Sequence, residues 1–264
     1  MMHAYFAYIK LALLKQIHYQ AELLIWLIGR VLEPLLYLVI WSTVADANGG
    51  RVDTFTAGDF AAYFIAEMLV NYATYTAVMW EYEYRVRNGA LSAMLLRPLH
   101  PIHADLAETL ANKLLNFLVM LPTAVLLVLT FKPTLHLNAW TMLTFVPALL
   151  LAFALRFLME WILAMAAFWT TRVSAINAMY FAGMLFLSGQ MTPLALLPAP
   201  IQTLATFLPF RWVIAFPIEL FLGRLTSREV GVGIAMQAGW LFCMLGLLAC
   251  VWRLGIRRYS AVGA

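Results

Sequence analysis

Long apolar runs separated by short polar breaks decide what this chain can fold into. A helix needs roughly 20 apolar residues to cross the hydrocarbon core of a bilayer. Hydrophobic residues make up 64% of the sequence and charged residues 11%, a composition outside the usual range of water-soluble domains. We therefore predict an all-α integral membrane protein, with six transmembrane helices in a single domain over residues 1–264. The predicted spans lie at about 23–45, 59–81, 111–131, 140–168, 174–191 and 230–252.

The first 22 residues have a different pattern from the later runs. Their apolar residues fall on one stripe at helical spacing, while Lys10 and Lys15 lie elsewhere. This pattern is typical of an amphipathic helix in the membrane surface, and we predict such an interfacial helix over residues 1–22. Most lysines and arginines then fall on the side of the amino terminus. By the positive-inside rule, we predict a multi-pass protein of the inner (cytoplasmic) cell membrane with both termini in the cytoplasm.

The most strongly charged part of the chain, residues 84–110, follows the second apolar run. Within this charged segment Leu91, Leu95 and Leu99 fall at helical spacing, and Pro98 should end or bend the helix. The pattern predicts a short amphipathic helix on the cytosolic side, between the second and third spans, that another protein could grip. An ordinary cytosolic loop with a surface helix would give the same periodicity, so both interpretations stay open.

A second unusual segment, residues 192–223, is apolar but interrupted by proline. Proline removes a backbone donor and breaks a regular helix, so one spanning helix is excluded here. The segment is also too apolar for a loop in water, and broken backbone at membrane depth is tolerated only when protein covers it. We predict a re-entrant pair of short helices that enters the membrane from the outer side before the sixth span. The prolines are Pro193, Pro198, Pro200, Pro209 and Pro217.

Two motifs resemble the permease subunits of type 2 ABC exporters. The pattern Arg-x-Gly-x-Leu-x-x-x-Leu-x-x-Pro is similar to the coupling-helix region of that family, and the run Ser-Gly-Gln-Met-Thr-Pro at 188–193 resembles its outward-facing re-entrant segment. A His-Pro-Ile-His insertion at 100–103 departs from the family and leaves the end of the coupling helix open. The coupling residues implied are Arg87, Gly89, Leu91, Leu95 and Pro98. The implied outward re-entrant gate consists of Gly189, Pro193, Pro198, Pro209, Phe210 and Pro217.

The resemblance implies a division of labour between this chain and its partners. Two ABC ATPase subunits would dock on residues 84–110, and a second permease chain, identical or different, would complete the pathway within membrane lipid. The substrate would be hydrophobic or amphipathic (a drug, a lipid or a lipid-linked molecule) and would move outward from the cytoplasm. The sequence contains no G-x-x-x-x-G-K-[ST] phosphate-binding loop. We therefore expect a non-catalytic subunit without cofactor or metal of its own, with ATP and Mg²⁺ on the partner ATPase, and no nucleic-acid partner.

Polar residues inside the predicted spans are further candidates for function. One pair of opposite charges lies three residues apart on the first span and another four apart on the fourth, so each pair can meet on one helix face. A charge at the centre of a spanning helix costs about 2.5–3.5 kcal/mol on insertion scales. These groups either line a substrate path or the subunit interface, or form structural ion pairs. They are Arg30, Glu33, Glu67, Asn71, Tyr72, Tyr75, Arg156 and Glu160.

Two alternatives belong to other functional classes. His100 and Asp105 form an H-x-x-x-x-D match of the kind found in some membrane-bound acyltransferases, but no anion-binding residues accompany them. A proton-coupled secondary transporter would use Glu67 and Glu160. Such transporters often have broken helices at corresponding places in two halves, whereas residues 192–223 have no counterpart in the first half of the chain.

Overall fold

The computed structural model describes residues 8, 10, 20–135, 138–170 and 173–259. Most of the predicted interfacial helix at 1–22 therefore lies outside the described residues. The described part is almost entirely helical, and its sheet is a two-stranded antiparallel hairpin of β1 (Arg51–Val52) and β2 (Phe55–Thr56). The all-α prediction is confirmed for the described chain.

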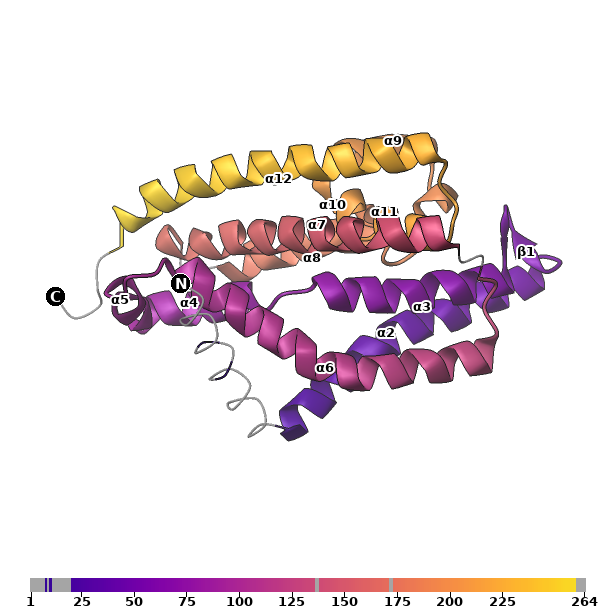
Figure 1. Ribbon diagram of the computed structural model, residues 1–264, viewed down its shortest axis with the longest axis horizontal. Helices are drawn as coiled ribbons and strands as arrows, with labels where there is room; N and C mark the ends of the chain where they lie inside the picture. The colour runs from indigo at the N-terminus through magenta and orange to yellow at the C-terminus, as the bar shows by residue number, and fades with distance from the viewer. Residues whose placement is uncertain (1–7, 9, 11–19, 136–137, 171–172, 260–264) are drawn as a thin grey trace.

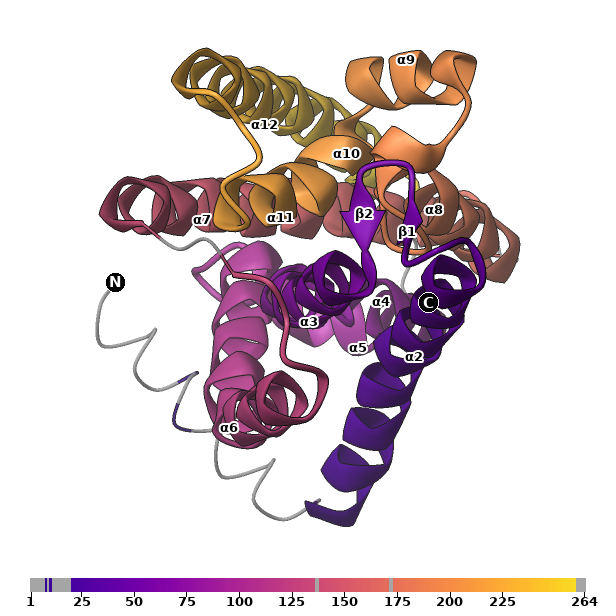
Figure 2. The same cartoon turned by 90° about the vertical axis from the view of Figure 1, so that its right-hand side faces the viewer.

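Most of the longest helices run along the long axis of the molecule, while the first of them crosses it obliquely (Figure 1 and Figure 2). They are α2 (Gln20–Ala47), α3 (Ala57–Thr74), α6 (Pro101–Phe131), α7 (Ala139–Ala164), α8 (Val173–Leu187) and α12 (Ser227–Ile256). The short helices gather towards the two ends, with α4 and α5 at one end (Figure 1). They are α4 (Val78–Arg87), α5 (Ala90–Leu95), η1 (Met165–Phe168), η2 (Leu194–Leu196), α9 (Ala199–Phe207), α10 (Pro209–Val213) and α11 (Ala215–Phe221).

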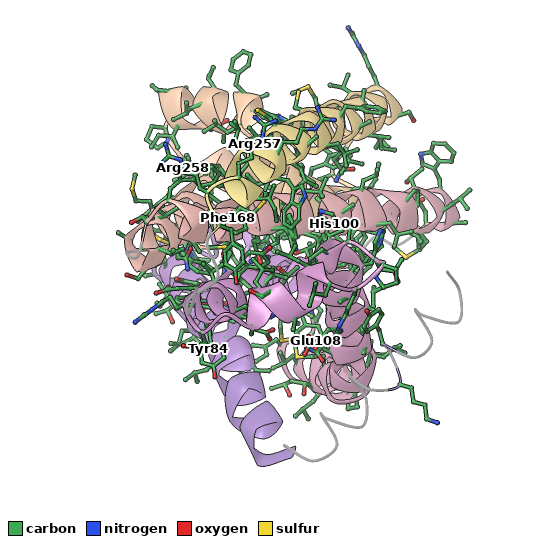
Figure 3. All side chains as sticks on the ribbon, turned by 90° about the vertical axis from the view of Figure 1, so that its left-hand side faces the viewer. Tyr84, His100, Glu108, Phe168, Arg257 and Arg258 are labelled. Carbon is green, nitrogen blue, oxygen red and sulfur yellow. The ribbon has the colours of Figure 1, made fainter. Side chains whose placement is uncertain are left out.

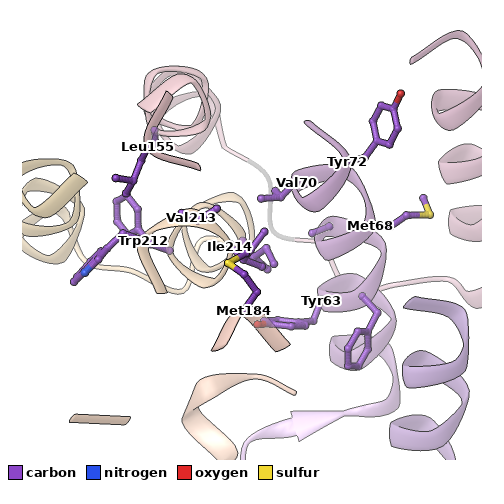
Figure 4. Close-up of a cluster of buried hydrophobic side chains, with 14 of the residues drawn as sticks. Tyr63, Met68, Val70, Tyr72, Leu155, Met184, Trp212, Val213 and Ile214 are labelled. Atoms are coloured by element: carbon purple, nitrogen blue, oxygen red, sulfur yellow. The ribbon is translucent and has the colours of Figure 1, made fainter. Parts of the chain in front are cut away.

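α3 is the central helix of the bundle. Every side chain from Phe60 to Ala66 is buried, and the helix packs against α2, α6, α7 and α11, as the end view shows (Figure 2). Tyr63 points from α3 toward Met184 and Ile214, while Tyr72 points away from them (Figure 4). Burial all around a helix, rather than on one stripe, is the mark of a core helix.

Several helices begin at capping boxes, in which a side chain and a backbone group satisfy each other at the first turn. Thr56 and Asp59 form one at the start of α3, and Thr226 and Glu229 form another at the start of α12. These boundaries follow directly from the local sequence.

The helix boundaries around the charged segment differ from the prediction. A continuous second span was predicted over 59–81, but α3 ends at Thr74 and a new helix, α4, begins at Val78. The third span was predicted to begin near residue 111, but α6 already begins at Pro101. The second half of the charged segment is therefore the first part of a long helix rather than a loop.

Two helical stretches of the described chain are long and apolar enough to cross a membrane by length and composition, Ala139–Phe168 and Ser227–Ile256. The helices Met120–Phe131 and Val173–Leu187 are apolar but shorter. The central helix α3 carries Asp59, Glu67 and Asn71, which lower its hydropathy. α12 presents large apolar side chains on its surface, among them Phe242 and Leu254.

Candidate functional site

A tight turn joins α4 to α5 within the charged segment. Gly89 has a φ of +71° and is the N-cap residue of α5. Glycine populates this left-handed conformation at little cost because it has no Cβ. Leu91, the second residue of α5, is fully buried against the core. The structure therefore places Gly89 and Leu91, two of the five predicted coupling residues, at the root of the short helix.

The far side of this turn is exposed. α5 ends at Leu95, so Pro98 lies beyond the helix instead of inside it. Leu96 is 88% exposed, and Arg97 and Pro98 beside it are exposed as well. Leu96 was not among the predicted site residues. The sequence contained a signal for its exposure, because Leu96 is an apolar residue outside the stripe of apolar residues that α5 buries and is followed by Arg-Pro.

An ion pair fastens the charged segment to the helices behind it. Arg85 of α4 binds Asp105 of α6, and Trp161 of α7 donates from Nε1 to the other carboxylate oxygen of Asp105 at 2.9 Å. Glu81 and Glu108 also lie within ion-pair distance of Arg85. The Asp105 side chain is only 2% exposed. Three helices therefore meet at one buried carboxylate.

His100 is the N-cap residue of α6. Its Nδ1 accepts a hydrogen bond from the backbone N–H of Ile102 at 3.3 Å, and its ring lies 4.2 Å from that of Trp252 and 5.5 Å from that of Trp161. Burial lowers the pKa of His100, which fits a neutral imidazole that accepts through Nδ1.

His100 and Asp105 do not act as an acid–base couple in the described chain. His100 is engaged with Ile102, while both oxygens of Asp105 bind Arg85 and Trp161. The acyltransferase alternative gains no support from this geometry. Figure 3 looks onto this end of the molecule and shows His100, Phe168, Arg257 and Arg258 together at it.

A second polar cluster lies deeper, where α3 gives way to α4. Arg156 of α7 donates from Nε to Glu160 at 2.8 Å and from one terminal nitrogen to Asn71 at 2.7 Å and Thr74 at 3.1 Å. Glu160 also accepts from Tyr180 of α8 at 3.2 Å. The pairing of Arg156 with Glu160 predicted from their spacing is confirmed, and both side chains are almost fully buried.

Tertiary contacts stabilise the break between α3 and α4. Thr76 in the break donates to Glu160. Lys113 of α6 donates from Nζ to the backbone carbonyls of Tyr72 at 3.0 Å and Tyr75 at 2.7 Å, which are orphan carbonyls at a helix end. The guanidinium of Arg156 lies 5.3 Å from the ring centre of Tyr75. The predicted residues Tyr72 and Tyr75 thus serve this cluster partly through their backbone, and Lys113 was missed because its partners lie far away in sequence.

The remaining predicted intramembrane residues lie apart from this cluster. Glu67 is 1% exposed, and neither of its carboxylate oxygens has a hydrogen-bond partner within the described chain, although Asn71 lies close by. Glu33 is exposed on α2. The side chain of Arg30 lies outside the described residues, so its pairing with Glu33 stays a prediction.

Close contacts join the residues just before the proline-rich segment (residues 192–223) to α2 and α3. Tyr63 of α3 donates from its hydroxyl to the carbonyl of Gly189 at 2.8 Å, and Trp41 of α2 donates to the carbonyl of Met191 at 3.2 Å. Gly189 has a φ of +89°, and a Cβ there would lie 2.6 Å from the Tyr63 hydroxyl. Only glycine fits this position without a shift of its neighbours.

The prolines of this segment mark the boundaries of short helices. Pro193 and Pro198 precede η2 and α9, and Pro209 is the first residue of α10. Pro217 lies inside α11, and Phe210 packs so closely on α8 that a Cβ on its Gly183 would lie 2.9 Å from the ring. The segment is thus broken into short helices, as predicted, with more pieces than a simple pair.

Comparison with known proteins adds one finding. A family model described as "ABC-2 family transporter protein" matches residues 27–263, a range that contains both the charged and the proline-rich segments. Comparison with curated proteins and with solved structures gives no significant match. Among the described residues, no group of three or more His, Cys, Asp or Glu side chains could hold a metal ion. The chain therefore belongs to the ABC-2 transporter family and is a helical membrane protein with a transport permease role.

Proposed function

We propose that this chain is the transmembrane subunit of an ATP-driven exporter, powered by two copies of a separate ABC ATPase that bind the charged segment. A second permease chain, identical or different, completes the pathway. The substrate is hydrophobic or amphipathic and moves from the cytoplasmic side outward. ATP and Mg²⁺ belong to the ATPase, consistent with the generally non-catalytic role of ABC-2 permeases.

The arrangement of the charged segment is the observation that carries this proposal. Its tip presents Leu96, Arg97 and Pro98 to the outside, while Leu91 and the Arg85–Asp105 pair hold its root in the protein. An exposed arginine beside a protruding apolar side chain suits docking into a pocket of a partner, because arginine is among the residues that carry much of the binding energy of interfaces. A rigid root lets a push on the tip move α4 and α6 together.

The proposed membrane topology has six spans in one permease domain, which α2, α3 with α4, α6, α7 with η1, α8 and α12 would form. The positive-inside rule supports a topology with both termini in the cytoplasm of an inner membrane. The proline-rich segment then lies on the outer side, as a re-entrant gate above the pathway.

The buried polar residues have different roles in this proposal. Arg156 and Glu160 satisfy each other and their neighbours, so they act as a structural clamp, since breaking such a buried pair is strongly destabilising. Glu67 is buried without a hydrogen bond in the described chain. We place Glu67 at the substrate path or at the interface with the second permease.

The test compares two exposed arginines at opposite ends of the molecule. Arg97→Glu reverses the charge at the tip of the charged segment, and Arg51→Glu makes the same change in β1. We expect Arg97→Glu to reduce co-purification of the ATPase and its ATP hydrolysis by about tenfold, whereas Arg51→Glu leaves both unchanged. Equal behaviour of the two variants would contradict docking at the charged segment. Substrate movement in proteoliposomes that needs a proton gradient and no ATP would instead favour the secondary-transporter alternative.

A further inference from the structure

Like α7, α12 touches both the aromatic residues beside the charged segment and the short helices of the proline-rich segment. It contains 30 residues, which at 1.5 Å per residue gives a length of about 45 Å. In Figure 1 it runs along the molecule from the proline-rich segment to the end that holds α5. Unlike α2, α6 and α7, which contain Pro34, Pro122 and Pro147, it has no internal proline, the commonest cause of a kink.

The carboxyl-terminal end of α12 is attached to the coupling helix α5. The hydroxyl of Tyr259, three residues after α12, lies 2.8 Å from the hydroxyl of Ser92 in α5. The Tyr259 ring also packs edge-on against Phe168 of η1, with centroids 5.9 Å apart. Gly255 lies so close to the Phe168 ring that a Cβ on this glycine would be 2.4 Å from a ring carbon. The end of α12 therefore packs against η1 without space between them and bonds to α5.

One turn earlier, Trp252 of α12 joins the cluster that fastens the charged segment. Its ring centroid lies 4.2 Å from that of His100 at the start of α6 and 5.4 Å from that of Trp161 in α7. Trp161 in turn binds Asp105, the partner of Arg85. Displacement of the charged segment must therefore press on α12 at two successive turns.

The amino-terminal half of α12 holds the proline-rich segment by equally specific contacts. Gln237 is fully buried and donates from Nε2 to the carbonyl of Trp212 in α10 at 2.8 Å and to that of Ala148 in α7 at 3.0 Å. Gly233 faces Phe216 of α11 so closely that a Cβ would lie 2.0 Å from its ring. Packed interiors do not absorb such displacements by compression.

We propose that α12 transmits movement of the coupling helix to the proline-rich segment, and that Ser92 and Tyr259 are the positioning residues that fasten α5 to it. This inference rests on the proposed function, in which the ATPase moves the charged segment. Neither residue touches substrate. Each acts by fixing the place where α5 meets the end of α12.

The experiment measures coupling between the two ends directly, since spatial adjacency alone does not establish coupling. The complex with its ATPase is placed in proteoliposomes, with the exposed cysteines of α12 removed as Cys243→Ala and Cys250→Ala. Thr192→Cys then reports on the proline-rich segment. Thr192 is 6% exposed and follows Met191, whose carbonyl accepts from Trp41. The readout is the rate of labelling by a membrane-impermeant maleimide, with and without MgATP.

The key variant is Tyr259→Phe, which removes one hydroxyl and keeps the ring against Phe168. Its control is Thr130→Val, which removes one hydroxyl from an exposed residue of α6 outside the charged segment. We expect MgATP to change the labelling rate in the parent protein. The MgATP-dependent change should fall at least threefold in Tyr259→Phe, about the effect of one hydrogen bond, and stay as in the parent in Thr130→Val.

The outcomes separate this inference from the proposed function. Failure of the parent chain to bind an ATPase would overturn the proposed function and, with it, the inference. If the ATPase binds and hydrolyses ATP but Tyr259→Phe responds like the parent, the inference alone is wrong. Ser92→Ala provides an independent check, because a shared hydrogen bond predicts that the double variant is no worse than either single variant.

Discussion

The two ends of the helix bundle are held by different kinds of contact. At the charged segment, side chains bind side chains, as in the Arg85–Asp105 pair and the bond from Trp161 to Asp105. Just before the proline-rich segment, side chains of α2 and α3 bind backbone carbonyls, those of Met191 and Gly189. Charged pairs fix orientation and resist sliding, whereas contacts to a broken backbone satisfy groups that no helix satisfies. The first end suits a part that is pushed, and the second suits a part that must open and close.

The largest expected effect comes from breaking the charged end. Asp105→Ala leaves the Arg85 guanidinium without its buried partner and should lower the free energy of unfolding by about 3–5 kcal/mol. Glu83→Ala removes an exposed pair with Arg87, 3.5 Å apart, and should cost less than about 1 kcal/mol. Denaturant unfolding in detergent measures both. Similar losses in the two variants would show that Asp105 does not hold the charged end.

A smaller but clear effect is expected at the other end from Gly189→Ala. The substitution places a Cβ in a left-handed conformation, which costs about 1–2 kcal/mol, and against the Tyr63 hydroxyl. Gly231→Ala is the matched control, because α12 offers open space at that position and alanine favours a helix. We expect a lower melting temperature for the first variant and an unchanged or higher one for the second. A stable Gly189→Ala protein would contradict the close fit.

Tyr63→Phe should have a still smaller effect, because it removes one hydroxyl and leaves the ring in the core. The lost bond to the Gly189 carbonyl should cost about 1 kcal/mol of unfolding free energy. Tyr84→Phe is exposed and should be neutral. If Tyr63→Phe were equally neutral, the contacts to backbone at this end would contribute nothing to its stability.

The smallest effect concerns pH at the start of α12. The backbone N–H and the hydroxyl of Thr226 donate to the carboxylate of Glu229. Protonation of this carboxylate removes the charge that strengthens both bonds, so their contribution to stability is present at neutral pH and is lost in acid. Glu229→Gln should therefore flatten the decline in stability below about pH 4.5. An acid transition identical in the two proteins would argue against the capping box.

The same contrast explains what could be predicted from the sequence. The Arg156–Glu160 pair lies within one helix, so spacing alone placed it. The Arg85–Asp105 pair joins residues of two different helices, and no local sequence pattern predicts such a contact. The break after Thr74 contains neither glycine nor proline. It exists because Lys113 and Glu160 from other helices satisfy its free groups. In contrast, the prolines of residues 192–223 predicted from the sequence alone that this segment forms short helices.

The most direct test of the central claim is photocrosslinking from one exposed residue at each end. A photoreactive amino acid replaces Leu96 at the tip of the charged segment or Phe207 at the end of α9, which are 88% and 70% exposed, in a complex purified with its ATPase. We predict crosslinks to the ATPase from position 96 and none from position 207. Crosslinks from position 207, or none from position 96 in a complex that hydrolyses ATP, would contradict the account.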